Sequence, residues 1–124
     1  MTTQVQDCIT DLRGWLGDRL STAAAVREHH GRDTTFHPVM PPDAVVFPQT
    51  VQEVQRVVAT CAARRVPLIA FGTGTSCEGH IAALRGGISL DTSGLNRIRA
   101  VHEADMDATV EAGVTRKTLN AHLH

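Results

Sequence analysis

Aromatic residues and excess positive charge are both scarce in this chain of 124 residues. It holds three Phe, one Trp and no Tyr. Proteins that bind single strands stack bases on aromatic side chains, and duplex binders carry clustered Lys and Arg. Here 12 basic side chains face 13 acidic ones, so the formal net charge is −1. The composition therefore argues against nucleic acid as a partner.

Long apolar runs and paired cysteines are missing too. No run approaches the roughly 18 apolar residues that a transmembrane helix needs. The first residues lack the basic and apolar regions of a signal peptide. Cys8, Cys61 and Cys77 are odd in number and widely spaced, which argues against a disulfide framework or a zinc knuckle. We expect a protein of a reducing compartment, cytoplasmic or peripheral to the inner face of the membrane.

The first third of the chain predicts two helices and then an irregular segment. Apolar residues recur at helical spacing over residues 4–16, and Gly17 ends the pattern. Ser21 is the expected N-cap of a shorter helix that runs to His29. Prolines exclude a helix over residues 32–42. We therefore separate a helical arm, residues 1–42, from a domain that begins at residue 43.

Residues 43–71 predict a strand, a helix and a second strand. An apolar strand is expected at residues 44–47, and Thr50 and Glu53 form a capping box that starts a helix. Another apolar run, Pro67–Phe71, follows that helix. Strand, helix and strand within about thirty residues form a βαβ unit, so we expect these two strands to pair in parallel. The fold class is α/β (or α+β) with a small parallel sheet.

The remaining residues predict a hairpin and a last helix. A third short strand is expected at residues 88–91. Alternating apolar and polar residues at 98–102 and 109–112 predict the two strands of the hairpin. Thr115 is the expected N-cap of a helix that carries Leu119 and Leu123 on one side.

A glycine-rich loop follows the Pro67–Phe71 strand and is the strongest functional signal. Glycine permits positive φ and close approach of the backbone to a ligand. Successive N–H groups in such a turn form a concave site for an anion, to which hydroxyls add donors. The loop therefore predicts a phosphate or pyrophosphate site formed by Gly72, Thr73, Gly74, Thr75, Ser76 and Gly79.

Other interpretations of this loop fit less well. A P-loop requires Lys and Ser/Thr after its last glycine, where His80 and Ile81 stand. A Rossmann fingerprint for NAD requires a third glycine at the position of Cys77, although Asp91 lies at the spacing of its ribose-binding acid. A purely structural glycine turn is the remaining alternative.

The sequence also contains candidate catalytic and metal-binding residues. His29, His30 and His37 lack the convergent partners that zinc requires, so no metal site is expected. His80 is interpreted as a polar residue that shapes the loop, and Cys77 as a small apolar filler rather than a reactive thiol. Ser93 and Gly94 are interpreted as a solvated turn. No nucleophile elbow is present, and no catalytic residue is assigned.

The order of three motifs carries a family resemblance. The glycine loop, then Gly86-Gly87-Ile88-Ser89-Leu90-Asp91, then Val110-Glu111-Ala112-Gly113-Val114-Thr115 resembles the FAD-binding domain of the vanillyl-alcohol oxidase / p-cresol methylhydroxylase superfamily. Within it, FAD-linked D-lactate dehydrogenases and glycolate oxidase flavoprotein subunits are most alike. The resemblance implies a p-cresol-methylhydroxylase-type FAD-binding fold.

The resemblance also implies a cofactor and an activity. Residues Phe71–Ser76 would wrap the FAD pyrophosphate, with Cys77 and Gly79 completing the site. Some relatives bond the flavin covalently through a histidine at the position of Thr75, so the FAD of this chain is expected to be non-covalent. The implied reaction oxidises a 2-hydroxy acid, D-lactate or glycolate, to the 2-oxo acid and passes electrons to an acceptor.

Length limits what this chain is expected to do alone. Family members have a second part of the FAD domain and a substrate domain, so residues 43–124 are expected to be the incomplete first part of an FAD-binding domain. An inactive amino-terminal fragment of the oxidoreductase is the first hypothesis. The alternative is a non-catalytic nucleotide-binding module.

Overall fold

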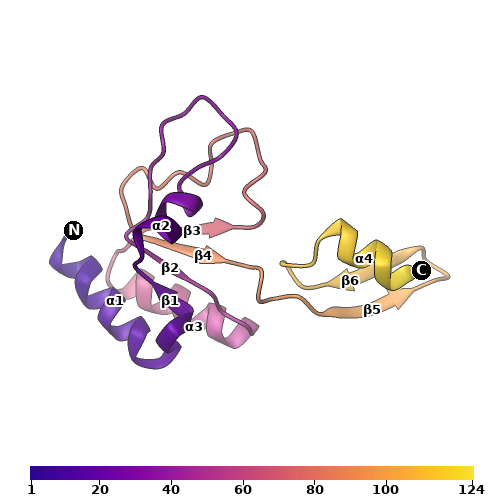
Figure 1. Cartoon of the computed structure of the whole chain (residues 1–124). Helices are drawn as coiled ribbons and strands as arrows, with labels where there is room; N and C mark the ends of the chain where they lie inside the picture. The colour runs from indigo at the N-terminus through magenta and orange to yellow at the C-terminus, as the bar shows by residue number, and fades with distance from the viewer.

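A computed structural model describes the whole chain, Met1–His124, as a four-stranded sheet with helices and a smaller hairpin unit (Figure 1). The hairpin unit, which carries the last helix, extends to one side of the sheet. In chain order the elements are α1 (Thr3–Leu16), the 3-10 turn η1 (Gly17–Arg19), β1 (Leu20–Ser21), α2 (Ala24–His30), β2 (Ala44–Val46), α3 (Val51–Ala63), β3 (Leu68–Phe71), β4 (Ile88–Asp91), β5 (Ile98–His102), β6 (Asp107–Val110) and α4 (Arg116–Leu123).

The sheet has the strand order β1-β2-β4-β3. The predicted direct pairing of the strands now seen as β2 and β3 is wrong, because β4 lies between them and pairs in parallel with both. At the centre, Ser89 of β4 is opposite Val45 on one side and Ile69 on the other. All four residues of β4 are buried, whereas β3 at the sheet edge is partly exposed, although Leu68–Phe71 is the more apolar sequence of the two.

The connection between β3 and β4, residues 72–87, contains the glycine loop and no helix. A Rossmann fingerprint places a helix directly after its glycines. The structure therefore contradicts the Rossmann alternative. The connection ends at Gly86 and Gly87, which have φ of 69° and 99°, and the Gly87 N–H donates to an Asp43 carboxylate oxygen at 2.7 Å.

The helices α1 and α3 cover one face of the sheet, and α2 lies on the other side (Figure 1). The amphipathic pattern predicted for residues 4–16 is confirmed, because α1 contributes its whole apolar stripe to the core. The helices α1 and α2 thus pack directly on the sheet. The main core cluster consists of Val5, Cys8, Ile9, Leu12, Leu16, Leu20, Ala44, Val46, Val57, Cys61, Val66, Ile88 and Leu90.

The segment after α1 differs from its prediction. Ser21 is not a helix N-cap, because Leu20 and Ser21 form the edge strand β1, antiparallel to β2. The Ser21 hydroxyl accepts a hydrogen bond from the Ala23 N–H instead, and α2 begins at Ala24. The Ser21 hydroxyl bonds a nearby backbone N–H much as a capping residue does, so the sequence alone placed the N-cap of this helix two residues early.

The helix starts predicted at Thr50 and Thr115 are confirmed. The Thr50 hydroxyl accepts from the Glu53 N–H at 3.1 Å, and the Thr115 hydroxyl accepts from the Thr118 N–H at 3.1 Å. The Glu53 carboxylate pairs with Arg19 at 2.6 Å. That hydrogen-bonded pairing is the main reason that the pKa of Glu53 is lowered.

The hairpin exists, but its second strand begins two residues earlier than predicted. His102 of β5 is opposite Asp107 of β6, with a tight turn between them. Glu111, which was expected in the strand, lies beyond it. The buried Glu111 carboxylate accepts from the Arg97 N–H at 2.9 Å and pairs with Arg99 at 3.2 Å. These bonds hold the end of the hairpin against its beginning. No helix of the chain has the length and apolarity to cross a membrane.

The three free cysteines differ in exposure, which predicts their order of reaction. The Sγ atoms of Cys8 and Cys61 lie 3.8 Å apart in the core, whereas Cys77 is exposed. Burial raises the pKa of Cys8 and raises that of Cys61 to about 12, and the thiolate is the reactive form. In native protein we expect a disulfide reagent such as DTNB to titrate Cys77 alone, with Cys8 and Cys61 reacting after denaturation. Native Cys77→Ser should not react; fast native labelling of Cys8 or Cys61 would contradict the packing of α1 on α3.

Candidate functional site

The glycine loop begins at the carboxyl end of β3, where ligands collect in open parallel sheets. Phe71 is buried, and its ring lies beneath the loop. Gly74 has φ of 71°, and a Cβ atom there would lie 2.6 Å from Cζ of Phe71. The loop therefore needs glycine at position 74 for its backbone conformation and for its contact with the ring.

The predicted site residues divide into two groups. Residues Gly72–Ser76 line a small cavity of about 170 Å³ together with His80 and Ile81. Across the loop, the hydroxyls of Thr73 and Thr75 lie 2.9 Å apart. Phe71 supports this group from below, and His80, adjacent to the loop as expected, borders the same cavity.

Cys77 and Gly79 do not line this cavity and instead lie against the segment that follows α2. The exposed Cys77 thiol lies 3.8 Å from the Thr34 hydroxyl, so it is not the apolar filler that was predicted. Gly79 has φ of 73°, and a Cβ there would lie 2.8 Å from the His37 ring. These two residues thus attach the loop to the segment that follows α2. In that segment, hydrogen bonds from Thr35 lower the pKa of the Asp33 carboxyl.

A larger cavity of about 380 Å³ opens on the other side of Gly72 and Thr73. Its remaining lining comes from the residues after β4 and from those before α4. Ser93, which was interpreted as part of a solvated turn, is among them. No local signal marks it, because the carboxyl ends of β3 and β4 meet at one edge only once β4 pairs beside β3, which the sequence did not predict. The residues that sequence analysis did not assign are Thr92, Ser93, Ala112, Gly113, Val114, Thr115 and Arg116.

Short backbone contacts hold the walls of this cavity together. The N–H and hydroxyl of Thr92 donate to the Phe71 carbonyl at 3.0 and 3.3 Å. Gly113 donates its N–H to the Leu95 carbonyl at 2.8 Å. A Cβ atom on Gly113 would overlap the Thr92 carbonyl oxygen, so the turn after the hairpin approaches the residue after β4 at a distance that only glycine permits.

The charges and donors around the cavity suit an anion. Arg116 is the only charged residue in the lining, and it stands at the amino-terminal end of α4. Backbone N–H groups at helix starts and glycine turns, with an arginine, are the usual donors to phosphate groups. The lining contains no His, Cys, Asp or Glu. This arrangement can hold a phosphate group, and it offers no side chain for proton transfer or nucleophilic attack.

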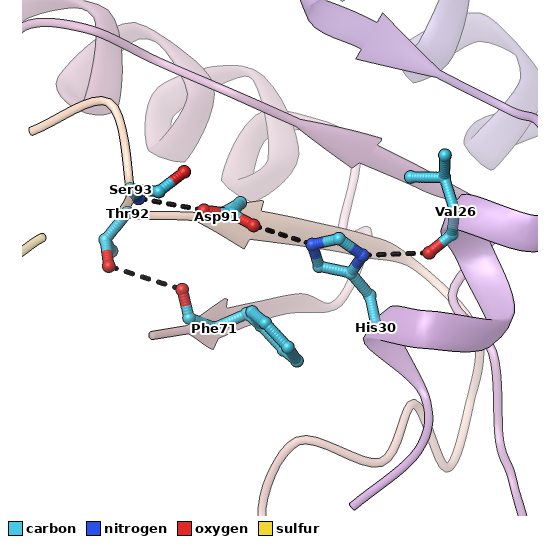
Figure 2. A network of polar contacts seen from close by, with 6 residues as sticks. All are labelled: Val26, His30, Phe71, Asp91, Thr92 and Ser93. Atoms are coloured by element: carbon cyan, nitrogen blue, oxygen red, sulfur yellow. Dashed lines mark hydrogen bonds and ion pairs between the residues drawn. The ribbon is translucent and has the colours of Figure 1, made fainter. Parts of the chain in front are cut away.

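A polar network around the buried His30 and Asp91 reaches Ser93 of the cavity lining (Figure 2). His30 of α2 places Nε2 2.7 Å from Oδ2 of Asp91, the last residue of β4. Its Nδ1 lies 2.8 Å from the Val26 carbonyl oxygen. The second carboxylate oxygen of Asp91 accepts from the Ser93 N–H at 2.8 Å. Sequence analysis weighed His30 only as a metal ligand and Asp91 only as a ribose-binding acid, because 61 residues separate the pair.

Comparison with known proteins identifies the cofactor class of this site. The model of a family described as FAD binding domain matches residues 42–124. The chain is 44% identical over 123 residues to "Probable D-lactate dehydrogenase, mitochondrial" of Danio rerio, covering 98% of this chain and 25% of that protein. It is 36% identical over 73 residues to glycolate oxidase subunit GlcD of Bacillus subtilis, covering 59% of this chain and 16% of that protein.

Solved structures share the fold. A p-cresol methylhydroxylase with bound substrate superimposes with a TM-score of 0.88 at 24% identity, covering 99% of this chain and 25% of that one. An alkyldihydroxyacetonephosphate synthase gives 0.85 at 23% identity, with 96% and 24% covered. The chain thus spans about a quarter of the length of those relatives that match nearly all of its residues.

Proposed function

The chain belongs to the family of FAD binding domains, and from this premise we propose that its larger cavity holds the pyrophosphate of FAD in a flavoprotein that oxidises a 2-hydroxy acid. D-lactate and glycolate are the proposed substrates, after the names of the relatives. In this proposal residues 43–124 form the first part of the FAD-binding domain, and residues 1–42 precede it and complete its core.

One observation carries the proposal: the cavity is lined by glycine backbone, hydroxyl side chains and Arg116, and it is open at Gly72. A Cβ built on Gly72 has no atom within 4 Å, so this position faces space rather than protein. A ligand can therefore approach the loop backbone directly at Gly72 and Thr73, and Arg116 belongs to the same lining. FAD fits these residues, because its two linked phosphates match the donors present.

The residues that line the cavity indicate which tasks FAD would perform and which the protein would perform. When bound, FAD would supply the redox chemistry by accepting a hydride from the α-carbon of the substrate. The residues of this chain would bind and orient it without forming a bond, because Thr75 lacks the ring nitrogen through which some relatives attach the flavin. Substrate and electron acceptor would be bound by other parts of a protein as long as the relatives. We place that protein in a reducing, cytoplasmic compartment, in keeping with three free thiols.

A non-catalytic nucleotide-binding module is the second candidate. The absence of any proton-transferring side chain in the cavity favours it. Addition of D-lactate or glycolate to an FAD-loaded protein that contains this chain and is as long as the relatives separates the two. Bleaching of the flavin absorption band would support the oxidoreductase, and an unchanged band would support a module that only holds the nucleotide.

The binding site itself is tested by a flavin titration. We expect FAD to bind the chain, monitored by quenching of its fluorescence, and ADP to compete because it carries the same pyrophosphate. Riboflavin lacks phosphate and should bind at least about tenfold more weakly, since charge-assisted bonds to the phosphates supply most of the affinity. Acid precipitation should release all flavin as free FAD. Equal binding of riboflavin and FAD would contradict a pyrophosphate site, and flavin retained in the pellet would contradict non-covalent binding.

A further inference from the structure

The buried pair of His30 and Asp91 links the amino-terminal helices to the cavity. His30 is 4% exposed and Asp91 is 7% exposed. Their bond joins α2 to the carboxyl end of β4, close to where both cavity loops begin (Figure 2). Burying two ionisable groups this deeply costs free energy unless each is fully paired. We therefore expect the pair to have a role at this position.

His30 contacts an oxygen atom through each of its two ring nitrogens. Both partners of the ring, the Val26 carbonyl and the Asp91 carboxylate, are hydrogen-bond acceptors. With the Asp91 carboxylate ionised, both ring nitrogens donate, and the pair is then an imidazolium beside a carboxylate. The aromatic rings of Phe71 and Phe47 enclose it, with ring centroids at 4.3 and 5.8 Å.

Each member of the pair contacts the base of one cavity loop. Asp91 accepts from the Ser93 N–H and so fixes the Thr92–Ser93 turn. His30 packs on the Phe71 ring, which lies beneath Gly74 in the glycine loop. The Thr92 N–H in turn donates to the Phe71 carbonyl, which links the two loops to each other. Both loops that face the cavity thus depend on one ion pair.

We propose that His30 and Asp91 are positioning residues for FAD: the ion pair holds the Gly72–Thr73 and Thr92–Ser93 walls at the separation that the pyrophosphate requires. This inference rests on the proposed function, because it assumes that FAD occupies the cavity between those walls. His30 lies in α2, before the residues that the family model matches. The proposal therefore means that this earlier segment also affects the affinity for FAD.

Two substitutions of Asp91 separate hydrogen bonding from mere occupancy of the site. Asp91→Ala removes the bonds to both Ser93 and His30, and we expect FAD affinity to fall at least about tenfold. Asp91→Asn keeps an oxygen for the Ser93 N–H, and its amide can donate to a neutral His30 that still bonds Val26. FAD affinity of Asp91→Asn should stay within about threefold of the original.

Spectroscopic readouts follow the positioning itself. The 15N shifts of the His30 ring should show two protonated nitrogens in the unaltered chain and one in Asp91→Asn. Hydrogen exchange of the Ser93 amide should accelerate at least about tenfold in Asp91→Ala and little in Asp91→Asn. These signals require no bound FAD.

Two control variants calibrate the result. Ser89→Ala removes a buried hydroxyl without a partner from the same strand, and FAD affinity should not change. Val57→Ala lowers stability from the core on the opposite face of the sheet, and it too should bind FAD normally once folded.

The outcomes are distinguishable. An unaltered chain that binds no FAD would overturn the proposed function and this inference with it. If that chain binds FAD and Asp91→Ala binds it equally well, only the inference is overturned. It is likewise overturned if Asp91→Asn is as weak as Asp91→Ala, if Val57→Ala loses affinity to the same extent, or if His30 carries one proton in the unaltered chain.

Discussion

Gly72→Val is expected to abolish FAD binding while leaving the fold intact. No atom lies within 4 Å of a Cβ at position 72, and the backbone there does not have positive φ, so the folded chain accepts the valine. The new side chain instead occupies space shared by both cavities that Gly72 lines. We expect FAD affinity to fall by about a hundredfold or more, with the melting temperature within about 2 °C of the original.

The measurement is a flavin fluorescence titration beside a thermal melt. Gly14→Val is the matched control, because Gly14 in α1 is equally free of neighbours and lies outside both cavities. Thr75→Ala serves as the mild variant, since the loop keeps its backbone N–H donors, and it should weaken binding by no more than about fivefold. Unchanged FAD affinity in a stable Gly72→Val would place the pyrophosphate elsewhere.

Position 72 makes a cleaner test than position 74. Valine at Gly74 would meet the Phe71 ring and would also need a positive φ that β-branched residues avoid. Any loss of FAD there mixes damage to the fold with damage to the site. The sequence presents the two glycines as equivalent members of one loop, and only the surrounding atoms show that one faces the ligand space and the other faces the protein.

Features with local causes were predictable from the sequence. The caps at Thr50 and Thr115 depend on bonds that span three residues, and the apolar stripe of α1 repeats within a turn. The glycine loop was predictable for the same reason, because its glycines and hydroxyl residues are consecutive in the sequence. Such signals need no knowledge of what lies opposite.

Features that depend on distant partners were not predictable in this way. The insertion of β4 between β2 and β3 is decided by burial of the whole sheet, which no single segment encodes. His30 and Asp91 meet only after that strand order is set. The second wall of the cavity likewise requires β4 beside β3 and the hairpin folded back at Gly113. The family resemblance predicted the cofactor, and only the structure showed which segments form the two walls of the cavity.

Gly113→Ala is expected to damage the site by forcing those walls apart. Its Cβ would overlap the Thr92 carbonyl oxygen and lie 2.8 Å from that of Leu95, and neither backbone atom can move like a side chain. We expect the free energy of unfolding to fall by about 2 kcal/mol, as for other overpacked sites. FAD affinity should fall at least about tenfold as well, because Thr92 and Gly113 both line the cavity.

The informative comparison is Gly87→Ala, which creates the same kind of overlap at the opposite end of β4. A Cβ there would overlap the Pro67 carbonyl oxygen, and φ of 99° adds backbone strain. Denaturant titration should therefore show at least as large a loss of stability as in Gly113→Ala. Its cavity is unaltered, however, so the folded protein should bind FAD with its original affinity. Equal loss of FAD affinity in both variants would mean that binding follows overall stability rather than the spacing between Thr92 and Gly113.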